Sequence, residues 1–226
     1  MIQKKRVGIL ISGRGSNMRS LIEAAKKPDF PAQIVVVISN RPKAAGLQTA
    51  QNEGIKNLAI DHRKYDNRSA FEQDLHQALV EAKVDLICNA GFLRLLTADF
   101  VDKWQDRQLN IHPSLLPSFK GLHTHQRVLE AGVKITGCTV HLVRTDMDAG
   151  PIIAQSAVCV EPGDDEDRLS ARVLAAEHLL YPHALDLFAS EKVIVKNERI
   201  EFANHSLTDT DSCSGPVFSP ALSLSV

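Results

Sequence analysis

The chain has 226 residues, of which 44% are hydrophobic and 23% are charged, as in an ordinary globular protein. Its formal net charge is -1, so no strongly basic surface argues for nucleic acid or membrane lipid as a partner. The length allows one sizeable hydrophobic core and is short for two full domains.

The cysteines and the first residues indicate a reducing compartment and no targeting segment. The four cysteines include no C-x-x-C pair, and isolated cysteines of this kind are typical of free thiols in the cytosol. The apolar run near the start extends only from Val7 to Ile11, which is too short for a signal peptide or a membrane span. We therefore expect a cytoplasmic protein.

Apolar runs and helical periodicities alternate along the first half of the chain. Short continuous apolar runs predict buried strands, and apolar residues at helical spacing predict the helices that follow them. This order predicts βαβ units that build a mostly parallel sheet with helices on both faces. In chain order, we expect strands at 7–11, 34–38, 58–60, 85–90 and 109–111, and helices at 17–27, 44–53 and 68–82.

The pattern changes in the second half of the chain. Thr136–Val143 and Ile152–Val160 are both strand-like and a polar loop separates them, which predicts an antiparallel pair added to the sheet. A long helix is expected from Asp165 to Ala189, with a break at Pro182 as an alternative. Residues 1–203 are thus predicted to form a single α/β domain, with a Rossmann-like sheet and an antiparallel extension near the C-terminal end.

Residues 204–226 differ from the rest of the chain in composition. They contain no Lys or Arg, are rich in Ser, and show no sustained hydrophobic period. A segment of this kind buries too little apolar surface to offset the entropy lost on ordering. We therefore expect a disordered C-terminal tail.

The segment Ser12–Asn17 follows the first expected strand and opens the first expected helix. Its glycines permit a sharp turn, and free amides at a helix start suit an anion such as phosphate. A dinucleotide fingerprint does not fit, because Met18 stands where a third glycine is required. Two interpretations remain open: a phosphate-binding loop, or a tight strand-to-helix turn with a capping Ser.

Asn110 and His112 lie two residues apart at the expected end of a strand, so their side chains point to the same side. Ligands of open α/β sheets bind at the carboxyl ends of the strands. An amide placed there can donate to a developing oxyanion, and an imidazole can move a proton. A polar strand end with a hydrogen-bonded histidine is the alternative.

Three further sets of polar residues are weaker candidates. Asp146 and Asp148 occupy a loop, where a carboxylate beside a histidine would orient its ring and favour its charged form; a solvated loop is the alternative. His123 and His125 have the spacing of a metal pair, but no cysteine or carboxylate at a suitable spacing completes a site. His141 lies within a strand and is expected to be packed there or to support residues of the site. We expect no metal.

Several segments, taken in order, resemble the phosphoribosylglycinamide formyltransferases, the folate-dependent enzymes of purine synthesis. The resemblance extends from about residue 7 to residue 204. The Asn-x-His…Asp set is shared with related folate formyltransferases and hydrolases, whereas Gly-Ser-Asn and Gly-Leu-His-Thr-His are more particular to the purine enzymes. The segments are Ser12–Asn17, Ala90–Leu96, Asn110–Pro117, Gly121–His125 and Asp148–Ile152.

The resemblance implies an activity: transfer of a formyl group from 10-formyltetrahydrofolate to the amine of 5-phosphoribosylglycinamide, without a metal. Asn110 and protonated His112 would stabilise the oxyanion, and Asp148 would hold a water that shuttles protons. The partners would be small molecules, with no nucleic acid or membrane, and a homodimer is left open. The residues implied to bind phosphoribosylglycinamide are Gly15, Ser16, Asn17 and Glu177. The residues implied to line the folate site are Arg68, Leu93, Arg94, Leu95, Leu96, Asn110, Val143, Arg144, Thr145, Asp146 and Met147.

The sequence departs from the family pattern at a few positions, none of them in the catalytic set. Ala149 stands where the family often has Gly, Leu174–Ala176 replaces more polar residues before the Glu, and Arg14 occupies a variable position.

Three rival functions are less well supported by the sequence. A methionyl-tRNA formyltransferase would need a C-terminal RNA-binding domain, and a formyltetrahydrofolate hydrolase would need an N-terminal regulatory domain. A nucleotide-binding module without catalysis would not need Asn110, His112 and Asp148.

Overall fold

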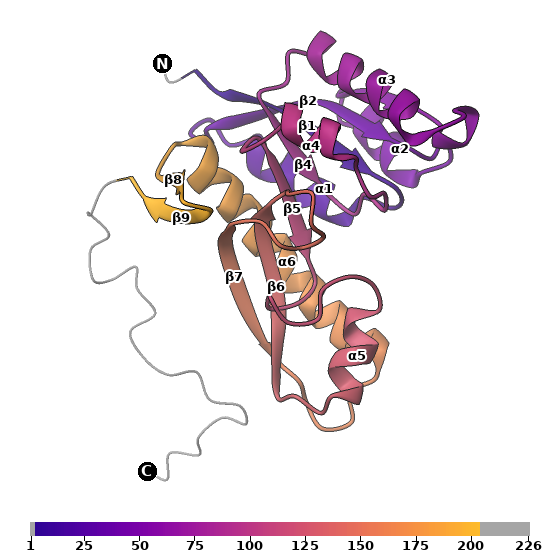
Figure 1. Cartoon of the computed structure of the whole chain (residues 1–226). Coiled ribbons are helices and arrows are strands. Elements are labelled where there is room, and N and C mark those ends of the chain that lie inside the picture. Colours follow the sequence, from indigo (N-terminus) through magenta and orange to yellow (C-terminus); the bar gives the residue numbers. More distant parts are fainter. Residues whose placement is uncertain (1–2, 204–226) are drawn as a thin grey trace.

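The computed structural model describes residues 3–203, and its centre is one seven-stranded sheet with the order β3-β2-β1-β4-β5-β6-β7 (Figure 1). β1 to β5 are parallel to one another, and β6 pairs antiparallel with both β5 and β7. The predicted α/β class and its antiparallel extension are therefore confirmed. The strands are β1 Lys5–Ile11, β2 Ala32–Ser39, β3 Lys56–Ala59, β4 Leu86–Asn89, β5 Gln108–His112, β6 Ile135–Leu142 and β7 Ile152–Cys159.

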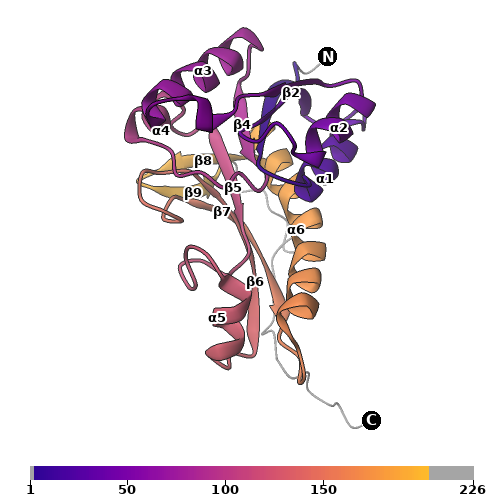
Figure 2. The ribbon, with the colours of Figure 1, turned by 90° about the vertical axis from the view of Figure 1, so that its right-hand side faces the viewer.

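Helices cover both faces of this sheet, as Figure 2 shows. Successive side chains of a strand point to opposite faces. In β1, Ile9 and Ile11 accordingly join the core cluster that includes α1, α2 and α6, whereas Leu10 joins the cluster that includes α3 and α4. The helices are α1 Ser16–Ala25, α2 Ala45–Asn52, α3 Arg68–Glu81, α4 Ala98–Lys103, α5 Thr124–Glu130 and α6 Glu166–Ala189.

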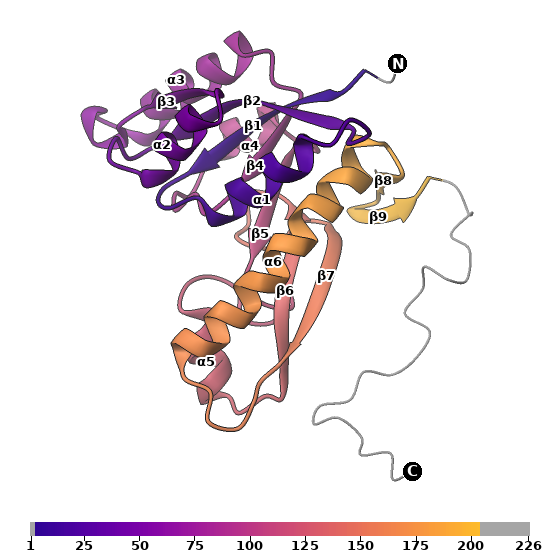
Figure 3. The same cartoon turned by 180° about the vertical axis from the view of Figure 1, so that it is seen from behind.

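α6 is the longest helix and runs along β6 and β7 from the neighbourhood of α5 to that of β8 (Figure 3). The Asp165 carboxylate caps its start by accepting a hydrogen bond from the Arg168 amide. The alternative of a break at Pro182 is wrong: the helix continues through it, with Tyr181 and Leu185 fully buried on either side. None of the helices within residues 3–203 is both long enough and apolar enough to cross a membrane.

The sequence did not predict α4, α5 or a C-terminal hairpin formed by β8 (Val193–Lys196) and β9 (Arg199–Phe202). The hairpin forms a separate two-stranded sheet, and its turn places Asn197 and Glu198 at φ 50 and 57. Two consecutive residues with positive φ are typical of the turns that suit hairpins. The predicted tail, 204–226, lies outside the described residues.

Candidate active site

The candidate site lies at the carboxyl ends of the parallel strands, around β1, β4 and β5. β2 and β4 flank β1 on opposite sides, so the strand order reverses at β1. Open α/β sheets bind ligands in the crevice at such a reversal. The loop after β1 and the run after β4 both start here, and β5 ends beside them at His112.

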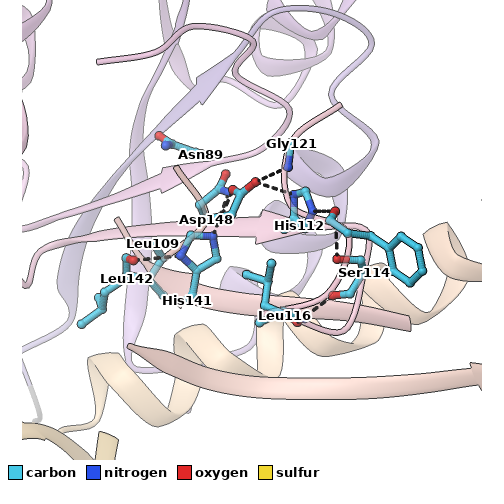
Figure 4. A network of polar contacts seen from close by, with 12 residues as sticks. Asn89, Leu109, His112, Ser114, Leu116, Gly121, His141, Leu142 and Asp148 are labelled. Atoms are coloured by element: carbon cyan, nitrogen blue, oxygen red, sulfur yellow. Dashed lines mark hydrogen bonds and ion pairs between the residues drawn. The ribbon is translucent and has the colours of Figure 1, made fainter. Parts of the chain in front are cut away.

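His112 is buried at the end of β5, and both of its ring nitrogens face oxygen atoms (Figure 4). Nε2 lies 3.0 Å from the Phe119 carbonyl oxygen, and Nδ1 lies 3.4 Å from Oδ2 of Asp148. A carbonyl and an ionised carboxylate can only accept hydrogen bonds. The surroundings of His112 therefore suit the doubly protonated, positively charged imidazole.

Asp148 lies in the loop between β6 and β7, and tertiary contacts bring it to His112. Its Oδ2 also accepts a hydrogen bond of 2.8 Å from the Gly121 amide, so one carboxylate joins three separate segments. Asp148 has φ 51, and a Cβ on Gly150 would lie 1.9 Å from the Leu142 carbonyl oxygen. The backbone of this loop is therefore tightly constrained at Gly150, whereas Ala149 is exposed and leaves room for its methyl group.

His141 belongs to the same cluster, which agrees with the expectation that it supports residues of the site. It pairs with Asn110 across β5 and β6. Its Nδ1 donates to the Leu142 carbonyl at 2.8 Å, so in the neutral ring Nε2 accepts from the Asn110 amide at 3.1 Å. Burial lowers the pKa of His141, which favours this neutral form. His141 thus orients the Asn110 amide, a role that depends on strand register.

The loop after β1 has the backbone expected of an anion site, and the alternative of a capping Ser is wrong. Gly15 occupies the position before α1 at φ 73, and no side chain caps the helix. The amides at the start of α1 therefore have no capping side chain to accept their hydrogen bonds. A ligand could supply that acceptor.

Asn17 and Glu177 meet beside this loop, although they are far apart in the sequence. Asn17 Nδ2 donates to Oε2 of the buried Glu177 at 2.7 Å, and the buried Oδ1 of Asn17 has no protein partner. Burial raises the pKa of Glu177, and the hydrogen bond from Asn17 partly opposes that effect. The pair places a buried carboxylate and an unpartnered amide oxygen beside the start of α1.

The residues expected to line a folate site differ in how far their side chains are exposed to solvent. Leu93, Leu95 and Met147 are exposed by 61%, 59% and 50%. Arg68 is exposed at the start of α3. Arg94, Leu96 and Val143 are half-buried, and Thr145 and Asp146 are exposed.

Arg144 is directed away from the His112 cluster. Its guanidinium pairs with Asp106 at 2.6 Å and with Glu198 of the hairpin turn at 2.7 Å. The loop that carries Asp148 is therefore also tied to the β8–β9 hairpin. Within residues 3–203, no group of three or more His, Cys, Asp or Glu side chains is arranged to hold a metal.

The model of the formyl transferase family matches residues 5–185 of this chain. The phosphoribosylglycinamide formyltransferase of Escherichia coli (strain K12) is 40% identical over 185 residues, which cover 82% of this chain and 87% of that enzyme. The trifunctional purine biosynthetic protein adenosine-3 of Bos taurus is 51% identical over 88% of this chain. That match covers 20% of the bovine protein, so the chain spans about a fifth of this relative's length.

Solved structures give the same result. The phosphoribosylglycinamide formyltransferase from Brucella melitensis is 50% identical with a TM-score of 0.80, over 86% of this chain and 100% of that chain. Glycinamide ribonucleotide transformylase 1 from Symbiobacterium toebii is 41% identical with a TM-score of 0.87, over 89% and 95%. The resemblance stated from the sequence is confirmed: the chain belongs to the formyl transferase family, among the phosphoribosylglycinamide formyltransferases.

Proposed function

We propose that this chain transfers the formyl group of 10-formyltetrahydrofolate to the amine of 5-phosphoribosylglycinamide, a step in the synthesis of purine nucleotides. The relatives from Escherichia coli and Brucella melitensis are phosphoribosylglycinamide formyltransferases, and a formyl donor derived from folate follows from the family. One observation carries the assignment to this site. His112 is buried at the end of β5, with one ring nitrogen beside the Asp148 carboxylate and the other beside the Phe119 carbonyl oxygen.

The loop after β1 is proposed to hold the ribonucleotide. Gly15 lets the backbone approach a phosphate closely, and the Ser16 and Asn17 amides can donate to it. The unpartnered Oδ1 of Asn17 and the carboxylate of Glu177 lie close by and can accept hydrogen bonds from the ribose hydroxyls.

The folate is proposed to lie over the run after β4 and beside the loop between β6 and β7. The exposed side chains of Leu93, Leu95 and Met147 offer apolar surface of the kind that a flat ring system covers. Arg68 could contact a carboxylate of the folate. The folate-lining roles of Arg94, Leu96, Val143, Arg144, Thr145 and Asp146 stay predictions.

The chemistry begins when the substrate amine attacks the formyl carbon and forms a bond to it. Negative charge then develops on the formyl oxygen, where the positive charge of His112 stabilises it. The Asn110 amide carries two N–H groups, and His141 accepts from this nitrogen, so one N–H remains for the oxyanion. The proton lost by the amine passes to the folate nitrogen as the bond from carbon to that nitrogen breaks. Asp148 is placed to hold a water for this transfer.

An assay with two arms tests the proposal. Purified chain is given 10-formyltetrahydrofolate with or without phosphoribosylglycinamide, and both folate product and formylated ribonucleotide are measured. We expect one formylated ribonucleotide for each donor consumed. Donor loss that is equal in both arms would instead indicate a hydrolase, and no donor loss in either arm would indicate a binding module.

We further propose that residues 1–203 are the formyltransferase domain and that 204–226 contribute little to it. Deleting 204–226 should leave the melting temperature and the turnover nearly unchanged, and a large fall in either would contradict this division. A cytoplasmic location, small molecules as the only partners, the absence of a metal and the open alternative of a homodimer also stay predictions.

A further inference from the structure

Ser12 lies at the junction between the loop after β1 and the run after β4. Its backbone amide donates to the Gly91 carbonyl at 3.0 Å. Its hydroxyl accepts a hydrogen bond of 2.8 Å from the Leu93 amide and donates one of 2.6 Å to Oδ1 of Asn40. Ser12 is 2% exposed, so water cannot readily replace these partners.

Packing and hydrogen bonds both hold the run Gly91–Leu96, because Phe92 and Leu96 pack against the core cluster that contains Leu10. It contains no helix or strand, and both Leu93 and Leu95 project into solvent. Exposed side chains contribute little to holding a backbone in place. The two hydrogen bonds to Ser12 therefore fix the backbone at Gly91 and at Leu93, on either side of the packed Phe92.

Asn40 fixes the direction of the Ser12 hydroxyl. Asn40 is 1% exposed, and its Oδ1 takes the hydroxyl hydrogen of Ser12. The lone pairs of the hydroxyl oxygen then remain to accept from the Leu93 amide. Asn40 is itself held by His62, which follows β3 in the chain. His62 Nδ1 donates to the backbone carbonyl oxygen of Asn40 at 2.9 Å. Hydrogen bonds thus connect the residues that follow four neighbouring strands: Leu93 after β4, Ser12 after β1, Asn40 after β2 and His62 after β3.

We infer that Ser12 is a positioning residue for the formyl donor: its hydroxyl holds the run Gly91–Leu96 where the folate is to bind. The inference rests on the proposed function, which places the folate over this run. Without the hydroxyl, the Leu93 amide loses its partner and can regain one from water only if the run moves outward. The affinity for the donor then falls, because the donor binds only when the run is in its inward position. Gly15, Ser16 and Asn17, which are proposed to hold the ribonucleotide in the loop after β1, are unchanged.

The test is Ser12→Ala, with Ser39→Ala as its matched control. Ser39 is also fully buried at a strand end, and its hydroxyl likewise donates once, to the Arg41 carbonyl, and accepts once, from the Arg41 amide. Both of its bonds stay within its own turn. For Ser12→Ala we expect the KM for 10-formyltetrahydrofolate to rise roughly 5- to 20-fold, as for a lost buried hydrogen-bond partner. The KM for the ribonucleotide, and kcat at saturating donor, should stay within about twofold of the parent.

The outcomes separate the inference from a general loss of structure. Ser39→Ala should keep both KM values, and the two variants should melt at similar temperatures. A donor KM for Ser12→Ala equal to that for Ser39→Ala overturns the inference, and so does an equal rise in both KM values. Ser12→Thr, which keeps the hydroxyl, should return the donor KM toward the parent value.

Two further measurements keep the test decisive. If Ser12→Ala does not fold, Ser12→Cys replaces it: the thiol forms weaker hydrogen bonds, so the donor KM should still rise selectively, and an unchanged value overturns the inference. An inactive parent chain would mean that the proposed function fails. An active parent with an unaffected Ser12→Ala would mean that this inference alone fails.

Discussion

The two parts of the proposed catalytic set are held in different ways. Asn110 and His112 lie in β5, between β4 and β6, where paired strands fix the backbone. Asp148 lies in a loop, at a positive φ, and reaches His112 through contacts with Gly121 and the constraint at Gly150. A strand places side chains by its own periodicity, whereas a loop places them only through its tertiary contacts.

This difference predicts how each part responds to substitution. A change at β5 should remove a chemical group while the fold persists, because the ladder of backbone hydrogen bonds does not depend on that side chain. A change in the Asp148 loop can instead act in two ways, by removing charge or by moving the backbone. The substitutions below separate these effects.

His112→Ala should have the largest effect. The imidazole is lost from a strand that stays paired on both sides, so turnover should fall by a factor on the order of 10² to 10⁴. Both KM values should change little, because the side chain stabilises developing charge more than bound substrate. Steady-state kinetics on the purified variant, with circular dichroism to confirm the fold, measures this. Near-normal turnover would remove His112 from the catalytic set.

Asp148→Asn should have a smaller effect, on the order of 10- to 100-fold in turnover, comparable to the loss of one charged or hydrogen-bonding partner. Asn tolerates positive φ well, and its side-chain oxygen can still accept from the Gly121 amide. The substitution therefore removes the charge while the loop stays in place.

A pH–rate profile of Asp148→Asn decides between a catalytic and a solvated carboxylate. A profile that overlays that of the parent in height and position would show that Asp148 is not part of the catalytic set.

Gly150→Ala changes the loop without touching a charge. The added Cβ would meet the Leu142 carbonyl, so the loop must shift and carry Asp148 with it. We expect a turnover loss of several-fold and destabilisation by about 1–3 kcal/mol, measured by thermal unfolding. Ala149→Gly, at the exposed neighbouring position, is the control and should change neither quantity appreciably. If both substitutions are silent, the loop is less constrained than the contact at Gly150 indicates.

The same contrast between strand and loop explains what the sequence could predict. Continuous apolar runs identified β1, β2 and β4, because burial on both faces requires them. α4 and α5 are too short to show a helical period, and the hairpin turn lacks the glycine that would mark it. The position of His112 at a strand end followed from the apolar residues before it and from Pro113, which ends the strand.

Other features of the site could be identified only from the structure. No spacing rule relates Asp148 to His112, so only the family resemblance suggested that they meet. The pairing of Asn110 with His141 depends on the register of β5 against β6, which the sequence does not specify. Likewise, no local pattern joined Arg144 to the two segments whose acidic groups its guanidinium pairs with.

The smallest predicted effect concerns His141, which supports Asn110 from within the sheet. Burial lowers the pKa of His141, so the unfolded chain binds a proton at this residue more readily than the folded chain does. Stability from this group is therefore present above the ordinary histidine pKa of about 6.5 and is lost as pH falls below it.

His141→Gln removes the titrating ring, and its amide can still accept from Asn110. Urea unfolding at several values between pH 5 and pH 8 should show a weaker loss of stability with falling pH in the variant, by at most one proton's contribution. The half-buried histidines His76, His125 and His178 have lowered pKa values too and should contribute to the dependence that remains. An unchanged dependence in His141→Gln would mean that His141 titrates alike in the folded and unfolded chains, and that the neutral ring is not what holds the Asn110 amide.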